Sequence, residues 1–539
     1  MLHDNKILLG KGDNNVYLLP KMANRHGLIT GATGTGKTVT LKVMAEGFSD
    51  MGVPVFLADI KGDVSSLSLA GTASDAITER LSRIGIASQD FPFKSYPCRF
   101  WDIAGKKGIP VRATVSDMGP LLLTRLLGLT DVQSGVLNIA FHVADDNGWE
   151  LIDLKDLRAM LTYVSDHKSE LTATYGNVST QSVGAIQRAL LNLQDQGGEL
   201  FLGEPMLDIN DWFATNEKGQ GMINLLHCSE LISSPMLYGT FMLWMLSELF
   251  ETLPEVGDQE KPKIVFFFDE AHVLFNNASK ALLEKIVQVV KLIRSKGVGI
   301  YFISQSPSDI PDEVLAQLNN RVQHALHAYT PAEQKAVKVA ANSFRPNPAF
   351  KTEDMISCLA TGEALISTLD ENGTPNIVEK ATILPPMSGS QIIEDAARAM
   401  LITNDPLYSK YKDAVDNISA YEQLNPEPAN DAVEAAASPS PESSDPNAAI
   451  KAAWEKSSVA QANAAKANQQ AAKPAGTVST TINKAVQSTV KSTARSIGRD
   501  TGKQITRNLL GTSNKYVNNA AGTFAGNIFS NLIGGVFKK

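Results

Sequence analysis

Apolar residues in the first part of the chain occur in short runs separated by polar turns, a pattern that indicates buried strands. Residues 6–20 contain two such runs around a polar turn and predict a small hairpin. Residues 26–30 form a third run, which precedes a glycine-rich loop, a helical pattern at 39–48 and a fourth run at 53–58. This order of strand, loop, helix and strand predicts a βαβ unit whose two strands pair in parallel.

The pattern becomes helical after residue 101 and stays helical to residue 193, which predicts a helical subdomain inserted into a sheet protein. Strand-like runs then return and alternate with helical patterns. The expected strands are 221–226, 264–269, 298–304 and 321–328, the expected helices are 235–252 and 279–296, and Asn372-Gly373 marks a hairpin between 365–369 and 377–383. The fold class that follows is α/β, with a central, mainly parallel sheet.

Composition and charge change after residue 424. Residues 425–480 are rich in Ala, Pro, Ser, Asn and Gln, a composition typical of disordered linkers. Residues 481–539 carry nine Lys and Arg residues against one acid, a net charge of +8; the whole chain carries −8, so residues 1–480 carry −16. An acidic body argues against a broad nucleic-acid-binding exterior, although it leaves room for a basic channel inside a ring. The tail itself fits a phosphate-binding segment, a weak membrane anchor or a solvated end.

The N-terminus shows no secretory signal, and the most apolar long stretch, 236–250, is too short to span a bilayer. We therefore expect a cytoplasmic protein. The three cysteines lie far apart, which predicts neither a disulfide framework nor a zinc site.

Residues 31–38, GATGTGKT, have the G-x-x-x-x-G-K-[ST] spacing between a predicted strand and a predicted helix. Glycines allow a tight turn, so that backbone N–H groups and the helix N-terminus point at a phosphate. Lys37 would reach the outer phosphates, and Thr38 would bind magnesium. A chance glycine-rich turn is the alternative, but it would not require the flanking strand and helix. The expected nucleotide-binding residues are Gly31, Ala32, Thr33, Gly34, Thr35, Gly36, Lys37 and Thr38.

Two carboxylates, Asp269 and Glu270, follow the apolar strand at 264–268 and would emerge at the carboxyl edge of the sheet, where ligands bind in open parallel sheets. Asp269 would hold magnesium, and Glu270 would be the base that polarises the attacking water. The alternative is a buried strand with an incidental acidic end. Together with the glycine-rich loop, the pair predicts a hydrolytic nucleotide site.

Two further polar positions are expected at the same edge. Gln305 follows the strand at 298–304 and would contact the γ-phosphate or the attacking water, unless it only caps the strand. Asp59, which precedes Lys61-Gly62-Asp63, ends the strand at 53–58 and would either lie near the site or cap its own loop.

Four segments of the sequence, GATGTGKT, ADIKGD, FFFDEAH and RSKGVGIYFISQSPSDIP, resemble the HerA/FtsK branch of RecA-like P-loop ATPases. The similarity is greatest to the bacterial HerA-like group called YjgR-like, covers residues 5–390, and keeps the four motifs in family order. The resemblance implies an ATP- and Mg²⁺-dependent ATPase that forms a homo-oligomeric, mostly hexameric ring and moves double-stranded DNA. It also implies Lys37 and Thr38 on the phosphates and magnesium, Asp269 and Glu270 as the acidic pair, and Gln305 as a sensor.

The resemblance also offers Arg294 as an arginine finger that reaches the site of a neighbouring subunit. A solvated cation at the end of the helix 279–296 is the alternative, and Arg321 and Arg345 are rival fingers. Only a short segment precedes the phosphate loop, whereas HerA motors usually carry a β-barrel there. Because that barrel docks the nuclease partner, this departure weakens the expectation of such a partner.

These inferences divide the chain into six parts. They are 1–110, a hairpin and the first half of the ATPase core; 111–215, the helical insertion; 216–390, the second half of the core; 391–424, a helical extension; 425–480, the linker; and 481–539, the basic tail. The expected function is an ATP-driven DNA translocase or helicase-like motor. The alternative is a P-loop ATPase that acts on a protein or on a membrane-transfer partner without binding DNA.

Overall fold

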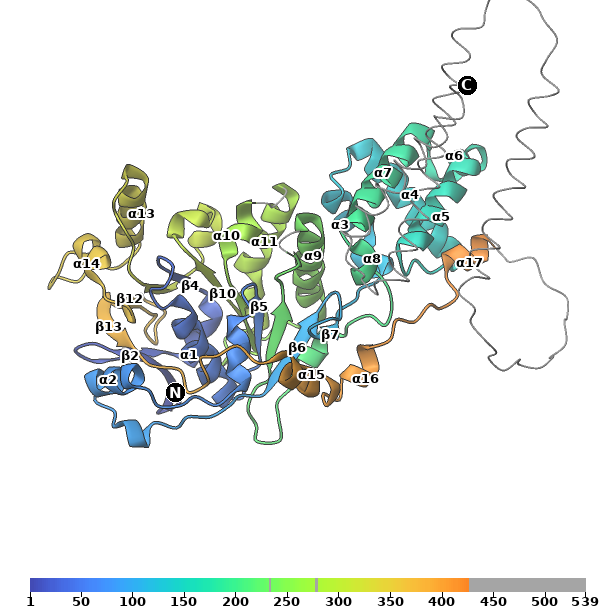
Figure 1. The fold of residues 1–539 in the computed structure, drawn as a ribbon. Helices are drawn as coiled ribbons and strands as arrows, with labels where there is room; N and C mark the ends of the chain where they lie inside the picture. Colours follow the sequence, from blue (N-terminus) through green and yellow to red (C-terminus); the bar gives the residue numbers. More distant parts are fainter. Residues whose placement is uncertain (232–233, 277–279, 426–539) are drawn as a thin grey trace, which may run out of the picture. The chain divides into compact units, whose positions relative to one another are not determined.

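A mainly parallel sheet forms the centre of the structure (Figure 1), a computed structural model that describes residues 1–231, 234–276 and 280–425. These residues belong to one unit, Met1–Asn430. The predicted linker, except for Asn425, and the predicted basic tail lie outside the described residues.

The parallel part of the sheet has the strand order β11, β4, β10, β9, β5, β8, β6, β7. All residues of β4, β5, β9 and β10 are buried, as expected for apolar strands that have helices on both faces. The order confirms the α/β class and the mainly parallel, RecA-like sheet. The bounds are β11 Asn320–Gln323, β4 Gly27–Thr30, β10 Val298–Ser304, β9 Ile264–Phe268, β5 Val55–Asp59, β8 Ile223–His227, β6 Cys98–Asp102 and β7 Ile109–Pro110.

The predicted pairing of the first two parallel strands is wrong. Strands β4 and β5 point the same way, but β10 and β9 lie between them. The reason is that both edges of β4 are hydrogen-bonded, to β10 and β11, and both edges of β5 are hydrogen-bonded, to β9 and β8, so neither strand has an edge left for the other. The predicted strand at 321–328 is also shorter than expected. After Gln323 the chain leaves the sheet and follows the glycine-rich loop, where Ala32 N–H donates to Ala325 O at 2.8 Å.

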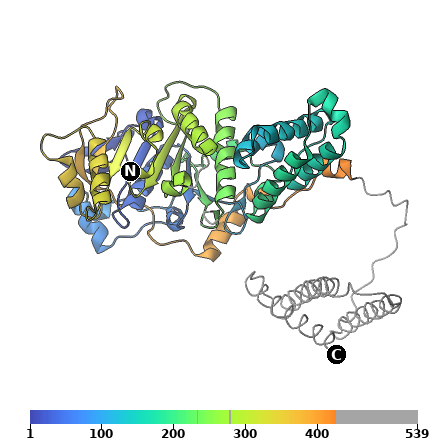
Figure 2. The same ribbon diagram turned by 90° about the horizontal axis from the view of Figure 1, so that it is seen from above.

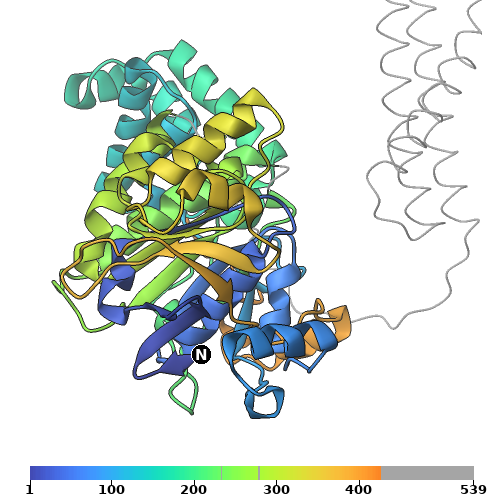
Figure 3. The same cartoon turned by 90° about the vertical axis from the view of Figure 1, so that its left-hand side faces the viewer.

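An antiparallel edge continues the sheet beyond β11, in the order β12, β13, β2, β1, with β3 paired to β2. Figure 3 turns this edge toward the viewer. Both predicted hairpins are confirmed: β2 pairs with β3 and β12 pairs with β13, each antiparallel. The bounds are β1 Leu2–His3, β2 Lys6–Lys11, β3 Asn15–Leu18, β12 Glu363–Ser367 and β13 Glu379–Ile383.

Helices pack on the sheet, and α9 and α11 lie side by side (Figure 1). The predicted helix 235–252 is confirmed as α9, whereas the predicted helix 279–296 is α11 followed by a separate 3₁₀ turn, Ile293–Lys296. The bounds are α1 Lys37–Asp50, α2 Asp75–Ile84, α9 Pro235–Thr252, α10 Ala271–Asn276, α11 Lys280–Leu292, α12 Asp312–Leu315, α13 Pro331–Asn342 and α14 Thr352–Cys358. Among the helices in the described part of the chain, none is both long and apolar enough to cross a membrane.

The predicted inserted helices are present, and in the sequence they come between β7 and β8. In space they lie beyond α9, away from the sheet (Figure 2). Capping boxes at Thr114, Thr130 and Asp153 begin α3, α4 and α5. Helix α3 packs against α9, and α4, α5 and α7 pack against one another. The bounds are α3 Val115–Leu126, α4 Asp131–Asn147, α5 Leu154–Asp166, α6 Lys168–Tyr175, α7 Thr180–Asp195 and α8 Gly198–Phe201.

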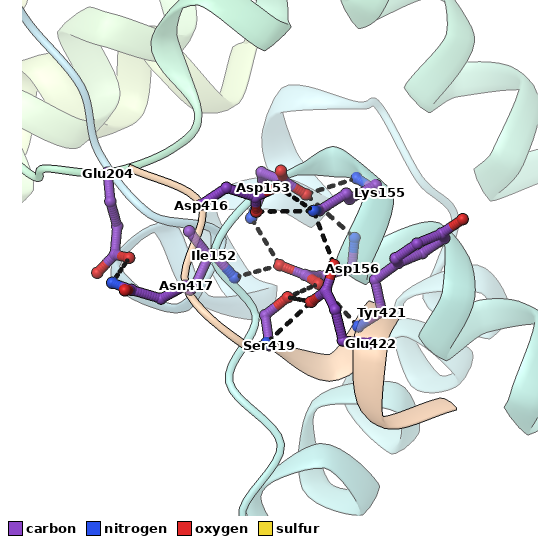
Figure 4. Close-up of polar contacts among 10 residues, drawn as sticks. All are labelled: Ile152, Asp153, Lys155, Asp156, Glu204, Asp416, Asn417, Ser419, Tyr421 and Glu422. Carbon is purple, nitrogen blue, oxygen red and sulfur yellow. Dashed lines mark hydrogen bonds and ion pairs between the residues drawn. The ribbon is translucent and has the colours of Figure 1, made fainter. Parts of the chain in front are cut away.

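Residues 395–424, which we call the strap, run from the sheet to the inserted helices and contain α15 Asp395–Thr403, α16 Tyr408–Tyr411 and α17 Ala420–Leu424. A buried ion pair between Arg99 and Asp405, 2.8 Å, holds the strap to β6. At its other end α17 packs on α5 (Figure 4). There the buried Asp156 carboxylate accepts hydrogen bonds from the Ser419 hydroxyl and from Tyr421 N–H.

Candidate nucleotide site

The glycine-rich loop lies between β4 and α1, as its spacing predicted. Its glycines allow His324 to approach the loop backbone closely, and they also allow the turn itself. A Cβ on Gly31 would lie 2.5 Å from the His324 Cβ, and Gly36 has a φ of 120° with the His324 ring 3.3 Å from where its Cβ would be. The buried His324, which directly follows β11, also contacts the Thr40 hydroxyl of α1 at 2.8 Å. It therefore packs against both the loop and the helix that follows it.

A buried cation and an open helix end meet in this loop. The Lys37 ammonium donates to Gly31 O at 2.7 Å and to Ala32 O at 3.1 Å. Burial lowers the pKa of Lys37, and the positive charge of Lys61 lowers it further. The Glu270 and Asp269 carboxylates raise this pKa and so act against burial. Helix α1 begins here with Gly36 as its N-cap and without a capping side chain, so its first N–H groups can serve an external acceptor. The loop therefore fits an anion.

The two carboxylates that follow β9 are buried at the same edge of the sheet. Asp269 is 7% and Glu270 6% exposed, and Asp269 Oδ1 accepts the Glu270 N–H at 2.9 Å. Burial and the neighbouring Glu270 charge raise the pKa of Asp269 to about 6. Glu270 has a φ of 46°, in the left-handed region that non-glycine residues rarely adopt. Such strain is characteristic of functional positions, where the surrounding structure fixes the direction of a side chain.

Glu270 is paired with Lys61, which lies in the loop after the neighbouring strand β5. The Lys61 ammonium forms an ion pair with Glu270 Oε1. Burial alone would lower the pKa of Lys61, but the hydrogen bond and the charge of Glu270 outweigh it and the pKa is raised. The other oxygen, Oε2, is buried and has no hydrogen-bond partner among the described residues. His272 Nδ1 lies 3.3 Å from it but is not oriented as a donor. One oxygen of this carboxylate is thus buried without a hydrogen bond from the described residues.

Asp59 lies close to this pair and also caps its own loop, so both of its predicted roles are compatible with the structure. Its Oδ1 accepts the Gly62 N–H at 2.7 Å. Burial raises the pKa of Asp59 to about 7, and the negative charges of Asp63 and Asp269 also raise it. The hydrogen bond from Gly62 and the positive charge of Arg398 lower this pKa. The carboxyl ends of β5 and β9 therefore form one cluster of unlike charges, as expected for adjacent parallel strands.

Gln305 directly follows β10 and is exposed. It lines a pocket of about 500 Å³ together with Ala32, Thr33 and His272. The structure thus brings Gln305 next to the phosphate loop, and its role as a sensor stays a prediction.

The three candidate arginine fingers lie in different surroundings. Arg294 is exposed in the 3₁₀ turn before β10, at the opposite edge of the sheet from Gln305. Arg321 is already engaged, because its guanidinium donates to Leu318 O, Leu315 O and Ser343 O at 2.9, 3.1 and 3.2 Å. Arg345 is exposed and donates to Pro375 O at 3.3 Å. Arg294 is therefore not brought to the phosphate loop of its own chain.

The sequence reasoning missed three contributors to this site. They are the pairing of Lys61 with Glu270, the support of the loop by His324, and the buried Arg398, whose charge opposes the raised pKa of Asp59. The Lys61 contact depends on the strand order, which makes β5 and β9 neighbours and has no local signal in the sequence. No local signal marks His324 or Arg398.

Comparison with known proteins gives relatives in one family. A DNA double-strand break repair helicase HerA of Sulfolobus acidocaldarius is 25% identical over 182 residues, 33% of this chain and 34% of the relative. A helicase of the same name from Pyrococcus furiosus is 21% identical over 383 residues, 64% and 63% of the two chains. The chain thus spans about one third and just under two thirds of the lengths of these curated relatives.

Solved structures with a similar fold include the bacterial conjugative coupling protein TrwB, with 14% identity, 73% of this chain and 93% of that chain covered, and a TM-score of 0.49. VirB4 of Thermoanaerobacter pseudethanolicus has 16% identity, 71% and 97% coverage, and a TM-score of 0.42. The family model described as "Helicase HerA-like C-terminal" matches residues 4–516. Because this match covers almost the whole chain and agrees with the motifs, the chain belongs to the HerA-like C-terminal helicase family.

Proposed function

We propose that this protein is an ATP-hydrolysing motor of the HerA/FtsK type. The observation that supports it best is the meeting, at one edge of the sheet, of the buried Lys37 cation and the α1 N-terminus with the buried pair Asp269 and Glu270. The Lys37 cation and the α1 N-terminus are the groups that bind a polyphosphate. Its hydrolysis also needs a metal ligand and a base, for which Asp269 and Glu270 are suited. ATP and Mg²⁺ are the cofactors that this set of side chains fits.

Each residue has a distinct task in this proposal. Residues 31–38 bind the phosphates, with Lys37 on the outer ones, and Thr38 and Asp269 hold Mg²⁺. The metal, when bound, neutralises phosphate charge. Glu270 orients and deprotonates the attacking water, and its Oε2, which accepts no hydrogen bond from the described residues, suits this task. Gln305 contacts the same region from the end of β10.

The motor's substrate is double-stranded DNA in this proposal, and the active form is a homo-oligomeric ring of six subunits in the cytoplasm. Family membership supports the DNA substrate, as do the names of the two archaeal relatives, which are DNA repair helicases. The position of Arg294 is compatible with the ring, because an exposed cation at the opposite edge of the sheet is accessible to a neighbouring subunit. A nuclease partner and membrane association through the tail form no part of the proposal.

The deciding experiment measures the ATPase rate with and without double-stranded DNA over a salt series. We expect stimulation that falls as salt rises, because phosphate contacts release counterions. ATP hydrolysis without stimulation at any salt would instead favour a protein or membrane-transfer partner. Glu270→Gln should retain nucleotide binding and lose at least about 100-fold in turnover, the usual contribution of a general base. Surviving turnover in Glu270→Gln would remove Glu270 as the base.

A further inference from the structure

The ion pair between Lys61 and Glu270 links two strands at the nucleotide edge of the sheet. Ala58 of β5 is opposite Phe268 of β9, so the residues that follow the two strands emerge side by side. Lys61 comes two positions after the end of β5 and meets Glu270, which comes two positions after the end of β9. The strand register therefore brings the two following loops together, and within them the Lys61 ammonium reaches the proposed base.

The two partners differ in their exposure. The Glu270 side chain is 8% exposed and is fixed by its left-handed backbone, whereas the Lys61 side chain is 46% exposed and ends a flexible stem. If the pair separates, Lys61 is the partner that can move. While the pair is formed, Lys61 occupies Oε1 and holds the carboxylate in an ion pair.

Lys61 also lies close enough to Lys37 for its charge to be felt there. The positive charge of Lys61 is one of the causes that lower the pKa of Lys37. Lys37 is the side chain that binds the outer phosphates in the proposed function. A nucleotide with a γ-phosphate therefore brings several negative charges into the neighbourhood of the Lys61 ammonium, where they compete with the single charge of Glu270.

We propose that Lys61 is a positioning residue that pairs with Glu270 before the nucleotide binds and transfers to the terminal phosphate of bound ATP, which frees Glu270 to act on water. This inference rests on the proposed ATPase function, and it explains why Glu270 does not act on water until a nucleoside triphosphate binds. ADP lacks the γ-phosphate and leaves the Lys61–Glu270 pair closed. Lys61 thereby distinguishes ATP from ADP.

The test is a double-mutant cycle on nucleotide binding. Dissociation constants are measured by calorimetry for a non-hydrolysable ATP analogue and for ADP, both with Mg²⁺, in the wild type, Lys61→Ala, Glu270→Gln and the double variant. Lys61→Ala should weaken analogue binding about tenfold and leave ADP binding unchanged. Glu270→Gln should tighten analogue binding about tenfold when Lys61 is present, because the competing pair is lost, and should have no effect on it in the Lys61→Ala background.

Two controls make the result specific. Lys94→Ala removes a similar pair, Lys94 with Asp50 at 2.7 Å, whose side chains are 39% and 13% exposed and which lies at the far end of α1. It should leave the affinities for both nucleotides unchanged. Lys61→Arg, which keeps the charge, should recover most of the preference of the wild type for the analogue over ADP.

Equal effects of Lys61→Ala on the analogue and on ADP, or additive effects of the two substitutions, would overturn the role of Lys61. Failure of the wild type to bind either nucleotide would instead overturn the proposed function itself.

Discussion

At the scale of single residues, the site brings unlike charges close together. Lys37 and Lys61 face Asp269 and Glu270, and the two acids emerge together because β9 ends at Phe268. Lys37, Asp269 and Glu270 are buried, which makes them sensitive to neighbouring charges, because interactions are stronger where water is excluded. A change in one partner is therefore expected to be felt by the others, and effects of substitutions in this group should not add.

A different buried group, His26, makes the fold sensitive to pH. Its Nδ1 accepts the Ile300 N–H at 3.0 Å, and its Nε2 lies 2.8 Å from Val290 O, so a neutral ring satisfies both contacts. Burial lowers the pKa of His26 from 6.5 to about 4; the Val290 contact opposes this and the charge of Arg294 reinforces it. Between these two values the unfolded chain binds a proton that the folded chain does not. The contribution of His26 to stability is therefore complete above pH 6.5 and is lost as the pH falls toward 4.

We expect the loss from His26 to amount to about 2 kcal/mol between pH 7 and pH 5. Urea unfolding of the wild type and of His26→Gln at the two pH values measures it, because the variant should show a pH dependence that is smaller by this amount. His142→Gln, at an exposed position of α4, serves as the control and should keep the dependence of the wild type. Equal pH dependence in His26→Gln and the wild type would refute the assignment.

At the scale of elements, the sequence predicted those whose residues carry a local signal. Periodicity identified α9, the apolar runs identified β9 and β10, and Asn372-Gly373 identified a hairpin. The candidate site was predictable for the same reason, because glycines and carboxylates at strand ends have chemical signatures. Strand order was not predictable, because β4, β5, β9 and β10 are all wholly buried, so burial does not distinguish their places in the sheet. The pairing of Lys61 with Glu270 depends on that order.

The contact between the strap and α5 is an element-scale feature that can be tested directly. Asp156 accepts hydrogen bonds from the N–H groups of Ile152 and Asp153, as well as from Ser419 and Tyr421 of the strap. Asp156→Ala leaves these donors without their acceptor, which should cost about 3 kcal/mol locally.

Hydrogen exchange measures the effect of Asp156→Ala, and amides of residues 417–425 should exchange faster while those of β9 keep their protection. Asp166→Ala removes an exposed acid from the last turn of the same helix and should change neither. Unchanged exchange at 417–425 in Asp156→Ala would show that α17 is held by its other contacts.

At the scale of the whole molecule, the position of Arg294 bears on assembly. Lys37→Ala should lack a working phosphate loop but keep Arg294, and Arg294→Ala should have the reverse defect. If Arg294 completes a neighbour's site, a mixture of the two inactive proteins contains some sites with both parts intact. Random mixing in equal amounts should restore roughly one quarter of wild-type ATPase activity.

Arg345→Ala provides the comparison for this complementation, since Arg345 is exposed as well. It should be active without a partner variant. Mixed rings of Lys37→Ala and Arg294→Ala that form, as judged by native mass, but remain inactive would contradict a finger at Arg294.

The strap also has a consequence for how the chain is made. Ser419, which closes the hydrogen bonds around Asp156, lies 263 positions further along the sequence. At about 5–20 residues per second, a ribosome needs roughly 13–50 s to synthesise that interval. During this time α5 has left the ribosome while its final partner has not been translated. The inserted helices are therefore expected to be a part of the nascent chain that depends on chaperones, and to reach their finished state only after the strap has been synthesised.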